Sequence, residues 1–519
     1  MANVCRLLLW VLCLVAALDV LSATPRVRGG NARRGGRRRG IGRRNRRLER
    51  PGVKARITQK GFDFASDLAI DLLMLELEHL RIPDVRETVG MAEATLSNIR
   101  FVRFPRPTSH LESLPGFGVR WTGTEMHPSI TADYSADFDF GFWSVTKTGT
   151  MQAQGRNLHF IVDFFIGRNT RTGRPIAEVY SCTCNGDVAL QFRGGWSDML
   201  NVGSQVLQDQ VEGLIGAQIC ANIKKEINTK LNAELEKLPV TQTVEELYQI
   251  DYHLVQYPEF VEGAMETYVK GAVYLATNPV EPPFQPPLLP VVDSHMDHMV
   301  YVYLTDYTLN SFAFAVFNSG VLRHSVNAAM LPDEAKVYLN TTCGTEICLG
   351  TIFPQLERLF PRSVAEVDVF ATVTPHVIIN QTTVRVDVAG EADFFVDGHA
   401  DETRDFLFSI NLTLSLTVDF DFVDDKVVFN VSEVLPAVQI KESSIGDIGS
   451  GFFFESVLRI ALKKFLLPKL TELGTTGVPM PVIPDVAILN TQIVPTNITS
   501  LLIVGTDIDF TGTLPSLND

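Results

Sequence analysis

Two segments of this chain combine residue types that are used in catalysis or ligand binding. His295 and His298 lie three residues apart with Asp293 and Asp297 beside them, and such groups bind zinc or transfer protons. We instead interpret this segment as a solvent-exposed stretch of chain that immediately precedes a strand. Residues 446–451 have the glycines of a phosphate-binding loop but no lysine and no preceding Rossmann unit, so we interpret them as the loop before a helix.

Familiar catalytic motifs are absent from the sequence. It contains no P-loop, no His-Glu-X-X-His and no Gly-X-Ser-X-Gly. The many Asp and Glu residues are interpreted as a solvated surface rather than as paired catalytic carboxylates. We therefore predict a protein that is not an enzyme, with no catalytic residue and no metal site.

The cysteines favour disulfide bonds over metal ligands. Two of the seven lie in the leader described below, and the other five form two clusters: Cys182, Cys184 and Cys220, then Cys343 and Cys348. An oxidising compartment favours one bridge in each cluster and leaves one thiol unpaired in the first. Zinc is the rival interpretation, but Cys-X-Cys without a nearby histidine or second cysteine pair makes a poor tetrahedral site.

The N-terminus is predicted to be a signal peptide over residues 1–23. Arg6 precedes an apolar run from Leu7 to Leu18, which is too short to span a bilayer. Glycan acceptor sequons support the same secreted, extracellular location, and all of them follow residue 290. They are Asn340, Asn380, Asn411, Asn430 and Asn497.

Charge is divided sharply along the chain. The formal net charge is -15, yet residues 24–50 contain twelve arginines and one glutamate. This Gly/Arg-rich arm has no apolar side and is expected to be disordered, either as a retained arm or as a propeptide. Arg44, Arg46 and Arg47 match the basic pattern of secretory processing proteases, so we predict cleavage there and an acidic mature chain beginning near Leu48. We expect no nucleic-acid partner.

A proline cluster divides the remaining chain into two halves. Residues 278–290 contain six prolines, which predicts an extended linker between domains at 51–277 and 291–519. Both halves alternate strands with amphipathic helices in similar order, a weak internal duplication. The expected helices are 61–80, 199–238, a short one near 349–360, and 452–471. Strands are expected over 95–195, 247–276, from 299, over 365–440 and over 484–511.

Five segments in order resemble the family of bactericidal/permeability-increasing protein, lipopolysaccharide-binding protein, and the cholesteryl ester and phospholipid transfer proteins. They are residues 51–66, Ile82-Pro-Asp84, the linker continuing to Ser311, Gly477-Val-Pro-Met-Pro481 and Leu502–Ile508. The resemblance runs from about residue 51 to residue 511. It implies an α+β fold of two pseudo-symmetric barrel domains, each with a long amphipathic helix. A central antiparallel sheet and the Pro-rich linker would join them into a boomerang.

The resemblance also implies a disulfide pairing. Cys184 would pair with Cys220, which leaves Cys182 as the unpaired thiol, and Cys182–Cys220 is the alternative. Cys343 and Cys348 would be an addition to the family pattern and form a small local bridge.

Each half of a protein with this resemblance would hold the acyl chains of a phospholipid. Burial of acyl surface contributes about 25 cal/mol per Å² and needs no directional contacts, which agrees with the absence of a chemical motif. Core packing is the alternative role for every candidate lipid contact. The candidates are Phe64, Leu68, Leu72 and Leu75 of the first helix, Val211, Ile215 and Ile219 of the long helix, and Leu458, Leu462 and Leu466 of the last helix.

We therefore predict a secreted lipid-binding protein that could also transfer lipid, with bound phospholipid as ligand and no cofactor. The alternative is an innate-immune, antibacterial binder of lipopolysaccharide that uses the Arg-rich arm and the N-terminal domain. Lipopolysaccharide-binding members of the family carry lysines where this chain has three Asp and one Lys, over residues 133–150. Membrane or lipoprotein surfaces are the remaining partner class, and the sequence gives no oligomeric state.

Overall fold

The computed structural model describes residues 49–511, apart from 79, 81, 90–91, 203, 245–246, 291–294, 331–335, 381–382, 398–403, 424–425, 450, 477 and 480–485. The predicted signal peptide, most of the Arg-rich arm and the processing residues Arg44, Arg46 and Arg47 lie outside the described residues. Among the described residues, Glu49 already makes contacts: its carboxylate pairs with Lys270 at 2.7 Å and with His253 at 3.5 Å. The folded body therefore includes residues before Pro51.

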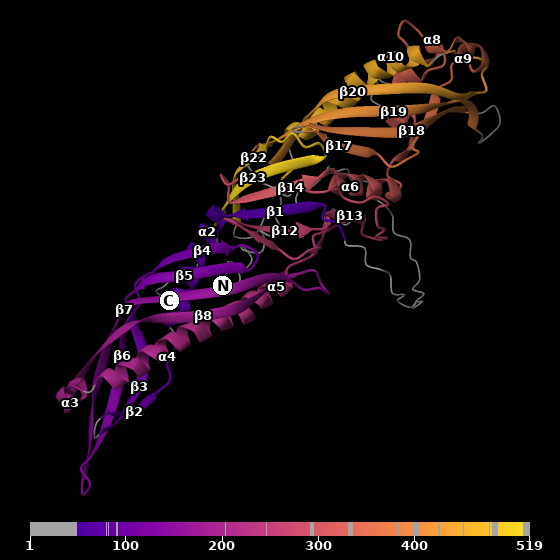
Figure 1. Ribbon diagram of the computed structural model, residues 1–519. Coiled ribbons are helices and arrows are strands. Elements are labelled where there is room, and N and C mark those ends of the chain that lie inside the picture. The colour runs from indigo at the N-terminus through magenta and orange to yellow at the C-terminus, as the bar shows by residue number, and fades with distance from the viewer. Residues whose placement is uncertain are drawn as a thin grey trace, which may run out of the picture.

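A six-stranded antiparallel sheet at the centre of the elongated molecule joins its two halves (Figure 1). β1 (Val53–Thr58) pairs with β12 (Ala264–Val269) on one side and with β14 (Val300–Thr305) on the other. The remaining strands are β11 (Glu259–Val261), β22 (Val486–Val494) and β23 (Leu501–Phe510), in the order β11-β12-β1-β14-β23-β22. The start, middle and end of the chain thus share one sheet, which fixes the halves to each other.

The N-terminal half is a long curled sheet in the order β2-β3-β6-β7-β5-β4, with β8 paired to β7. Its strands are β2 (Val85–Val89), β3 (Ala92–Arg103), β4 (Thr108–Leu114), β5 (Gly118–Met126), β6 (Ser129–Asp139), β7 (Ser144–Arg168) and β8 (Pro175–Gly194). Helix α2 (Gln59–Glu78) packs on β4, and α4 (Ser204–Lys225) packs on β8. Arg106 covers the polar side of α2 by donating to Asp67 and Asp71.

The C-terminal half is a second long sheet in the order β15-β16-β18-β19-β20-β21, with β17 paired to β18. Its strands are β15 (Arg323–Val326), β16 (Ala365–Ala371), β17 (His376–Asn380), β18 (Thr383–Asp397), β19 (Arg404–Val423), β20 (Lys426–Ser443) and β21 (Val478–Pro479). Two short helices, α8 (Leu349–Ile352) and α9 (Pro354–Leu359), lie at its far end (Figure 1).

Both halves repeat one order of elements. In each, a strand of the central sheet leads directly into a helix, β1 into α2 and β14 into α6 (Asp306–Ser319). The long sheet follows, and then a long helix interrupted by a π-helical segment. These helices are α4, η1 (Glu226–Leu231) and α5 (Asn232–Lys237) in the first half, and α10 (Phe452–Ala461), η4 (Leu462–Leu466) and α11 (Leu467–Thr476) in the second. Strands then return to the central sheet, so the two halves are pseudo-symmetric, as predicted.

Helix α6 was not expected, because the sequence suggested only strands after residue 299. Its buried positions Tyr307, Ser311 and Ala315 recur every four residues, which is helical spacing. Two of them are small or polar, so a search for apolar periodicity misses the stripe. The Ser311 hydroxyl accepts a hydrogen bond from the Val273 N–H at 2.8 Å and joins α6 to β13 (Ala272–Leu275). β13 belongs to a small sheet with β10 (Tyr248–Asp251) and β9 (Thr241–Val244).

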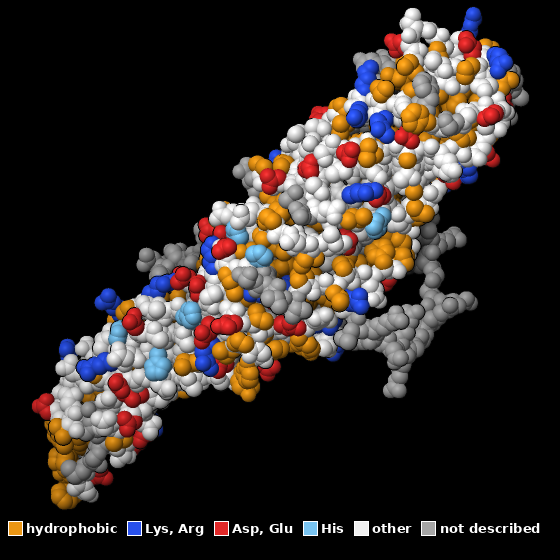
Figure 2. Space-filling view, turned by 45° about the horizontal axis from the view of Figure 1, so that its top comes forward, with side chains coloured by type: hydrophobic (Ala, Val, Ile, Leu, Met, Phe, Trp, Pro, Cys, Tyr) orange, Lys and Arg blue, Asp and Glu red, His pale blue; other side chains and the backbone are white. Residues whose placement is uncertain are grey.

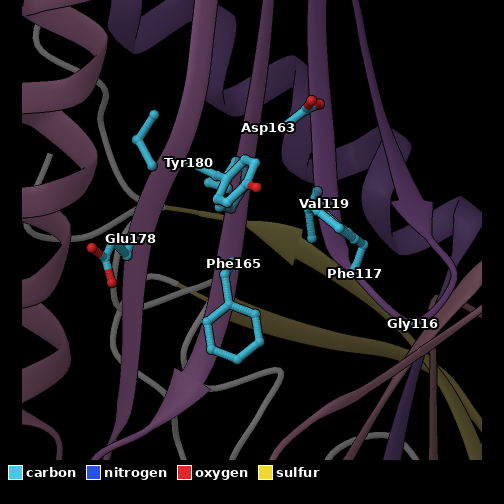
Figure 3. Close-up of a pocket in the computed structure, with 9 residues that line it drawn as sticks. Gly116, Phe117, Val119, Asp163, Phe165, Glu178 and Tyr180 are labelled. Atoms are coloured by element: carbon cyan, nitrogen blue, oxygen red, sulfur yellow. The ribbon is translucent and has the colours of Figure 1, made fainter.

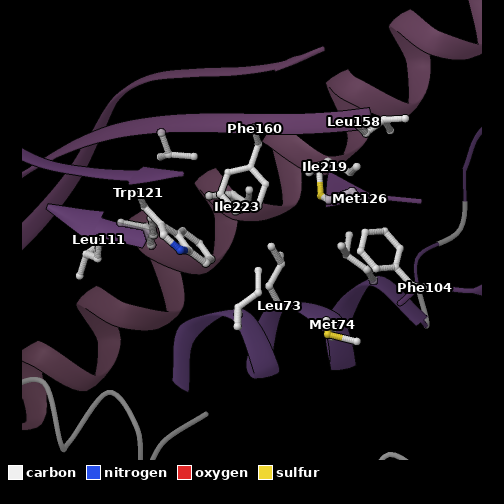
Figure 4. Packing of buried hydrophobic residues seen from close by; sticks show 14 of the residues in the cluster. Leu73, Met74, Phe104, Leu111, Trp121, Met126, Leu158, Phe160, Ile219 and Ile223 are labelled. Carbon is white, nitrogen blue, oxygen red and sulfur yellow. The ribbon is translucent and has the colours of Figure 1, made fainter. Parts of the chain in front are cut away.

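One large cluster of buried apolar side chains runs from the N-terminal half into the central sheet. Figure 4 shows part of it, where Leu73 and Met74 of α2, Trp121 and Phe160 of the sheet, and Ile219 of α4 pack together. A separate aromatic cluster lies in the C-terminal half and consists of Phe353, Phe394, Phe408 and Phe454 with aliphatic neighbours. Each half therefore has a core of its own.

The Pro-rich segment 278–290 lies outside every helix and strand, as its prolines require. It is held against the central sheet by polar contacts. Lys54 donates to the Pro290 carbonyl at 3.3 Å, and Glu281 accepts from Lys270 at 2.8 Å.

Candidate functional site

An apolar groove of about 500 Å³ lies across β5, β7 and β8 of the N-terminal half (Figure 3). Its wall consists of Gly116, Phe117, Val119, Asp163, Phe164, Phe165, Glu178, Val179 and Tyr180. Val119 is buried, whereas Phe117 and Tyr180 are 54% and 72% exposed and meet edge to face at 5.3 Å. Because these exposed aromatic rings line an apolar hollow, the groove is the candidate binding site.

Irregular pairing of β7 and β8 builds this groove. Asp163 pairs with Ser181, but the next residue, Phe164, pairs with Val179, so Tyr180 is an extra residue on β8. Such a β-bulge bends its strand and redirects a side chain. The two consecutive aromatic residues Phe164 and Phe165 are both half-buried and line the groove together.

The turn before β5 connects the groove to the central sheet. Gly116 has φ of +72°, which favours glycine, and its N–H donates to the Phe260 carbonyl at 2.9 Å. Gly118 lies so close to β7 that a Cβ atom there would be 2.5 Å from the Phe164 carbonyl oxygen. Both glycines therefore keep the backbone close enough to place Phe117 over the groove.

Two carboxylates are the charged groups in the wall. Arg120 donates to both oxygens of Asp163, at 2.7 and 3.0 Å, and Ser181 donates to it at 3.2 Å. The hydrogen bonds from Arg120 lower the pKa of Asp163, so this carboxylate stays ionised and paired. Glu178 is exposed at the rim. An uncharged, apolar ligand fits this lining better than an anion.

The lipid contacts predicted on the N-terminal helices lie elsewhere. Val211, Ile215 and Ile219 are each at most 1% exposed and pack in the core cluster of the N-terminal half. Leu68 is also buried there. Three α2 residues, Phe64, Leu72 and Leu75, are half-buried. None of the seven lines the groove, so lipid contact by these residues stays a prediction. The groove residues were not predicted, because a bulge has no signal in hydrophobic periodicity.

The C-terminal half presents a strip of half-buried apolar residues along its sheet. Leu414 pairs with Val388 of β18, and Leu416 pairs with Val386. The burial of all four is intermediate, unlike that of the aromatic cluster farther along the same strands. Helices α10 and α11 pack along the neighbouring strand β20.

The last helix carries the remaining predicted lipid contacts. Leu458 and Leu462 are half-buried, and Leu466 lies in η4, where its side chain is outside the described set. Incomplete burial leaves Leu458 and Leu462 with apolar surface that a ligand can cover. Their contact with lipid stays a prediction.

The disulfide pairing predicted from the resemblance is wrong. Cys182, not Cys184, bonds to Cys220, with the two Cα atoms 5.7 Å apart. Cys184 lies two residues beyond Cys182 along β8. Two residues of a strand span about the same length as one turn of a helix, so Cys184 lies about one turn of α4 away from Cys220. It faces Gly216, where an added Cβ would be 2.6 Å from the Cys184 carbonyl oxygen. Burial raises the pKa of the free Cys184 thiol to about 11, which makes it unreactive.

The second cysteine cluster forms one bridge. Cys343 bonds to Cys348, five positions later in the sequence and directly before α8. Cys343–Cys348 is the small local bridge predicted from the sequence.

The interpretation of His298 as solvated is also wrong. His298 is only 7% exposed, its Nδ1 lies 3.6 Å from an Asp507 carboxylate oxygen, and Gln492 contacts its Nε2. Gly505 on β23 makes room for the ring, because a Cβ there would be 2.5 Å from the His298 Cδ2. Asp293 lies outside the described residues. His298 is therefore part of the central sheet's packing.

Metal ligands and membrane-spanning helices are two further kinds of binding feature, and both concern the part of the chain that the structure describes. No group of three or more His, Cys, Asp or Glu side chains in that part of the chain is arranged to hold a metal ion. None of its helices is long and apolar enough to cross a membrane. The loop ending at Gly451 immediately precedes α10, where the Asp447 carboxylate accepts from the Gly449 N–H at 2.9 Å.

The predicted glycan acceptors differ in exposure. Asn340 is half-buried and its backbone bridges to Val364. The other four are exposed: Asn380, Asn411, Asn430 and Asn497.

Comparisons with known proteins match almost the whole folded chain. The model of the LBP / BPI / CETP family, N-terminal domain, matches residues 61–238, and that of the C-terminal domain matches residues 242–510. Bactericidal permeability-increasing protein of Sebastes schlegelii is 24% identical over 478 residues, covering 89% of this chain and 96% of the relative. Lipopolysaccharide-binding protein of Homo sapiens is 23% identical over 447 residues, covering 84% and 89%.

A solved structure has the same fold. The crystal structure of lipopolysaccharide binding protein aligns with 89% of this chain and 100% of its own, with a TM-score of 0.57 and 20% identity. At this identity the likeness shows the fold alone.

Proposed function

Because the chain belongs to the LBP / BPI / CETP family, we propose that it is a secreted lipid-binding protein that holds phospholipid acyl chains in apolar space. The groove across β5, β7 and β8 would admit or hold an acyl chain in the N-terminal half. The half-buried strip beside the last helix would do so in the C-terminal half. The proposal extends to the transfer of lipid between particles.

The observation that carries the proposal is the groove itself. Its volume of about 500 Å³ falls within the range of small-molecule sites, roughly 300–1,000 Å³. Phe117, Phe165 and Tyr180 contribute apolar surface that is incompletely covered by protein. Covering that surface with hydrocarbon is favourable by about 25 cal/mol per Å², without any hydrogen bond.

Charge at the groove favours a lipid with a cationic headgroup component. Asp163 is already paired with Arg120, which leaves Glu178 as the carboxylate at the rim without an ion pair among the described residues. Tyr180 and Phe117 line the same groove, and aromatic faces attract ammonium groups. A choline or ethanolamine phospholipid would place its ammonium group there.

Lipopolysaccharide binding is the second candidate, favoured by the names of the relatives. It would require free arginines, and three arginines of the N-terminal half are engaged with protein groups. Arg106 is paired with α2 carboxylates, Arg168 donates to the Val255 carbonyl at 3.0 Å, and Arg174 donates to the Leu238 carbonyl at 2.9 Å. These contacts weaken the second candidate relative to the first.

Lipid extraction from purified variants tests the proposal. Val179→Trp places an indole in the wall of the groove and is expected to lower the phospholipid recovered per chain. Val373→Trp is the matched control, because Val373 is 55% exposed and lies in the C-terminal half outside the groove. Equal recovery from both variants would remove the groove from the proposal. Displacement of bound phospholipid by stoichiometric lipopolysaccharide would favour the second candidate.

A further inference from the structure

Four aromatic side chains lie at the groove, and we call them the aromatic rim. Three of them line it, and the rings of Phe117 and Tyr180 meet at 5.3 Å. The fourth, Tyr257, packs against Phe165 with ring centroids 6.4 Å apart. Phe117, Tyr180 and Tyr257 are all more than half exposed, whereas Phe165 is half-buried. Figure 3 shows three of these rings around the hollow. The aromatic rim therefore offers ring surface to a ligand.

Two carboxylates flank the aromatic rim without an ion pair among the described residues. Glu178 is exposed in the groove lining, and its backbone pairs with that of Phe165 on β7. Glu262 is exposed in the turn after β11, two residues beyond Phe260, whose ring lies 6.4 Å from that of Phe165. Among the described residues, the groove lining contains no Lys, Arg or His. A guanidinium group can stack on a ring and also pair with a carboxylate.

Charge alone does not select a place for a cation on the face drawn in Figure 2. Asp and Glu side chains there are interspersed with Lys and Arg along the molecule. At the turn between β7 and β8, Arg168 and Arg174 donate to the Val255 and Leu238 carbonyls rather than to Glu178. The groove combines ring surface with unpaired carboxylates, which favours an arginine-rich ligand.

The chain itself contains an arginine-rich segment that ends close to the groove. Residues 24–47 contain eleven arginines and no acidic residue. They precede Glu49, whose carboxylate lies 3.5 Å from the His253 Nε2. His253 packs beside the β7–β8 turn, because a Cβ added to Gly173 would be 2.6 Å from the His253 Cβ. The described chain therefore begins beside the start of β8, the strand that carries Glu178.

The Arg-rich arm is long enough to reach the aromatic rim. Glu178 is five residues beyond Gly173, which is about 17 Å along β8 at about 3.3 Å per residue. Arg43 is six residues before Glu49, and six extended residues span up to about 20 Å. Arg43 and the arginines before it can therefore reach Glu178.

We propose that, before processing, the Arg-rich arm docks on the aromatic rim and keeps lipid out of the groove. Its guanidinium groups pair with Glu178 and Glu262 and stack on the exposed rings of Phe117 and Tyr180. The proposal rests on the proposed function in taking the groove as the lipid site. It assigns the arm a regulatory role at that site.

Tethering makes this contact depend on cleavage. A short tether gives an effective concentration of about 1 mM, so a dissociation constant of about 0.1 mM keeps the arm docked roughly nine-tenths of the time. A processing protease hydrolyses the Arg47–Leu48 peptide bond, and water supplies the new carboxyl and amino ends. The freed segment then dissociates wherever its concentration is below its dissociation constant. Cleavage therefore opens the groove.

Uptake of a fluorescent phosphatidylcholine by the full chain tests the proposal. Arg47→Ala keeps the arm attached, and deletion of residues 24–47 represents the cleaved form. The uncleaved chain should take up the probe about tenfold more slowly than the deletion variant, because roughly one-tenth of its grooves are free. Raising the salt concentration to about 0.5 M should reduce this difference, because it screens exposed charges.

Carboxylate variants locate the docking site. Glu178→Gln/Glu262→Gln, made in both the uncleaved and the deleted chain, should bring their two uptake rates close together. Comparison within each pair removes any direct effect of these residues on lipid. Glu357→Gln/Glu433→Gln is the matched control, because both residues are exposed in the C-terminal half, and it should leave the difference unchanged.

A synthetic peptide of residues 24–47 tests docking without lipid. The deletion variant should bind it with a dissociation constant of about 0.1 mM. Glu178→Gln/Glu262→Gln and, separately, Tyr180→Ser should each weaken binding about threefold or more, because exposed ion pairs and cation–π contacts are modest. Tyr180 is 72% exposed, so the melting temperature of Tyr180→Ser should not change.

Three results would overturn the proposal. They are equal uptake by the uncleaved and deleted chains, a Glu178→Gln/Glu262→Gln pair that behaves like the control pair, and a deletion variant that does not bind the peptide. Light scattering covers the other occupant: a dimer of the uncleaved chain that is lost on deletion would place the arm on a second copy and also contradict the proposal. Absence of uptake by both forms would instead refute the proposed function, and peptide binding alone would then decide whether the arm docks.

Discussion

Replacing Glu266 by glutamine should destabilise the central sheet strongly. Glu266 on β12 is 2% exposed, and one of its oxygens lies 3.2 Å from Lys54 Nζ and 2.7 Å from Arg56 Nη1 on β1. Tyr268 donates to the other oxygen at 2.9 Å. Lys54 also lies 4.1 Å from the centroid of the Tyr303 ring on β14. One carboxylate therefore compensates two cations inside the sheet that holds both halves together.

The expected loss of folding stability depends on the two positive charges that remain buried without their carboxylate partner. The side chains of Lys54 and Arg56 are 0% and 4% exposed, so water cannot replace the missing carboxylate. Removing one partner from a buried ion pair costs about 3–5 kcal/mol. At an unfolding entropy of about 2.1 cal/mol/K per residue over roughly 470 residues, this lowers the melting temperature by about 3–5 °C. Scanning calorimetry at constant protein concentration measures it.

Two further variants distinguish the cost of leaving a charge buried and unpaired from the cost of losing an exposed ion pair. Glu234→Gln removes the pair with Lys237, whose side chain is 62% exposed, and should cost less than about 1 kcal/mol. The triple variant Lys54→Met/Arg56→Met/Glu266→Leu removes all three charges and should recover most of the lost stability. A Glu266→Gln protein as stable as wild type, or a triple variant less stable than Glu266→Gln, would refute the reasoning.

Three other predictions follow from particular contacts. Burial of His253 disfavours its charge, but hydrogen bonds to Asp251 and Glu49 outweigh burial and raise its pKa to about 9 from 6.5. Because the folded pKa is the higher one, the stabilisation, at most ~3 kcal/mol, is complete below about pH 6.5 and lost as the pH rises through 9. The melting temperature should fall over that range, and His253→Gln should flatten the dependence. Cys182→Ser opens a loop of 38 residues and should cost ~4 kcal/mol in denaturant unfolding, whereas Cys184→Ser should be nearly neutral. Enzymatic deglycosylation followed by peptide mass mapping should find glycans at the exposed sequons and none at the half-buried one; the exposed sequons are Asn380, Asn411, Asn430 and Asn497.

The long elements of the fold could be predicted because their patterns are regular. The long helix predicted over 199–238 corresponds to α3 (Ser197–Val202), α4, η1 and α5, which end at Lys237. The six prolines predicted that residues 278–290 lie outside helices and strands, since neither accommodates them. The five segments that resemble the family, in the family's order, predicted the two halves and the central sheet. The helix and the proline segment depend on local propensity and periodicity, which a sequence displays directly, whereas the central sheet was implied by the resemblance.

The features that the sequence did not reveal depend on register and on contacts between distant segments. Tyr180 reaches the groove through a bulge between β7 and β8, and no residue pattern marks that bulge. Whether Cys182 or Cys184 meets Cys220 depends on how β8 lies along α4. His298 is buried because Gly505, more than two hundred residues later, leaves space for its ring. In each case the deciding neighbour is remote in sequence.

Native mass spectrometry of the intact protein tests the central claim most directly. The lipid-binding account predicts that the protein purified without added lipid retains one or more phospholipids, seen as mass increments that disappear on denaturation. Val179→Trp should retain fewer of them than Val373→Trp. Wild-type protein that consistently shows only the mass of the polypeptide and its glycans would contradict the account.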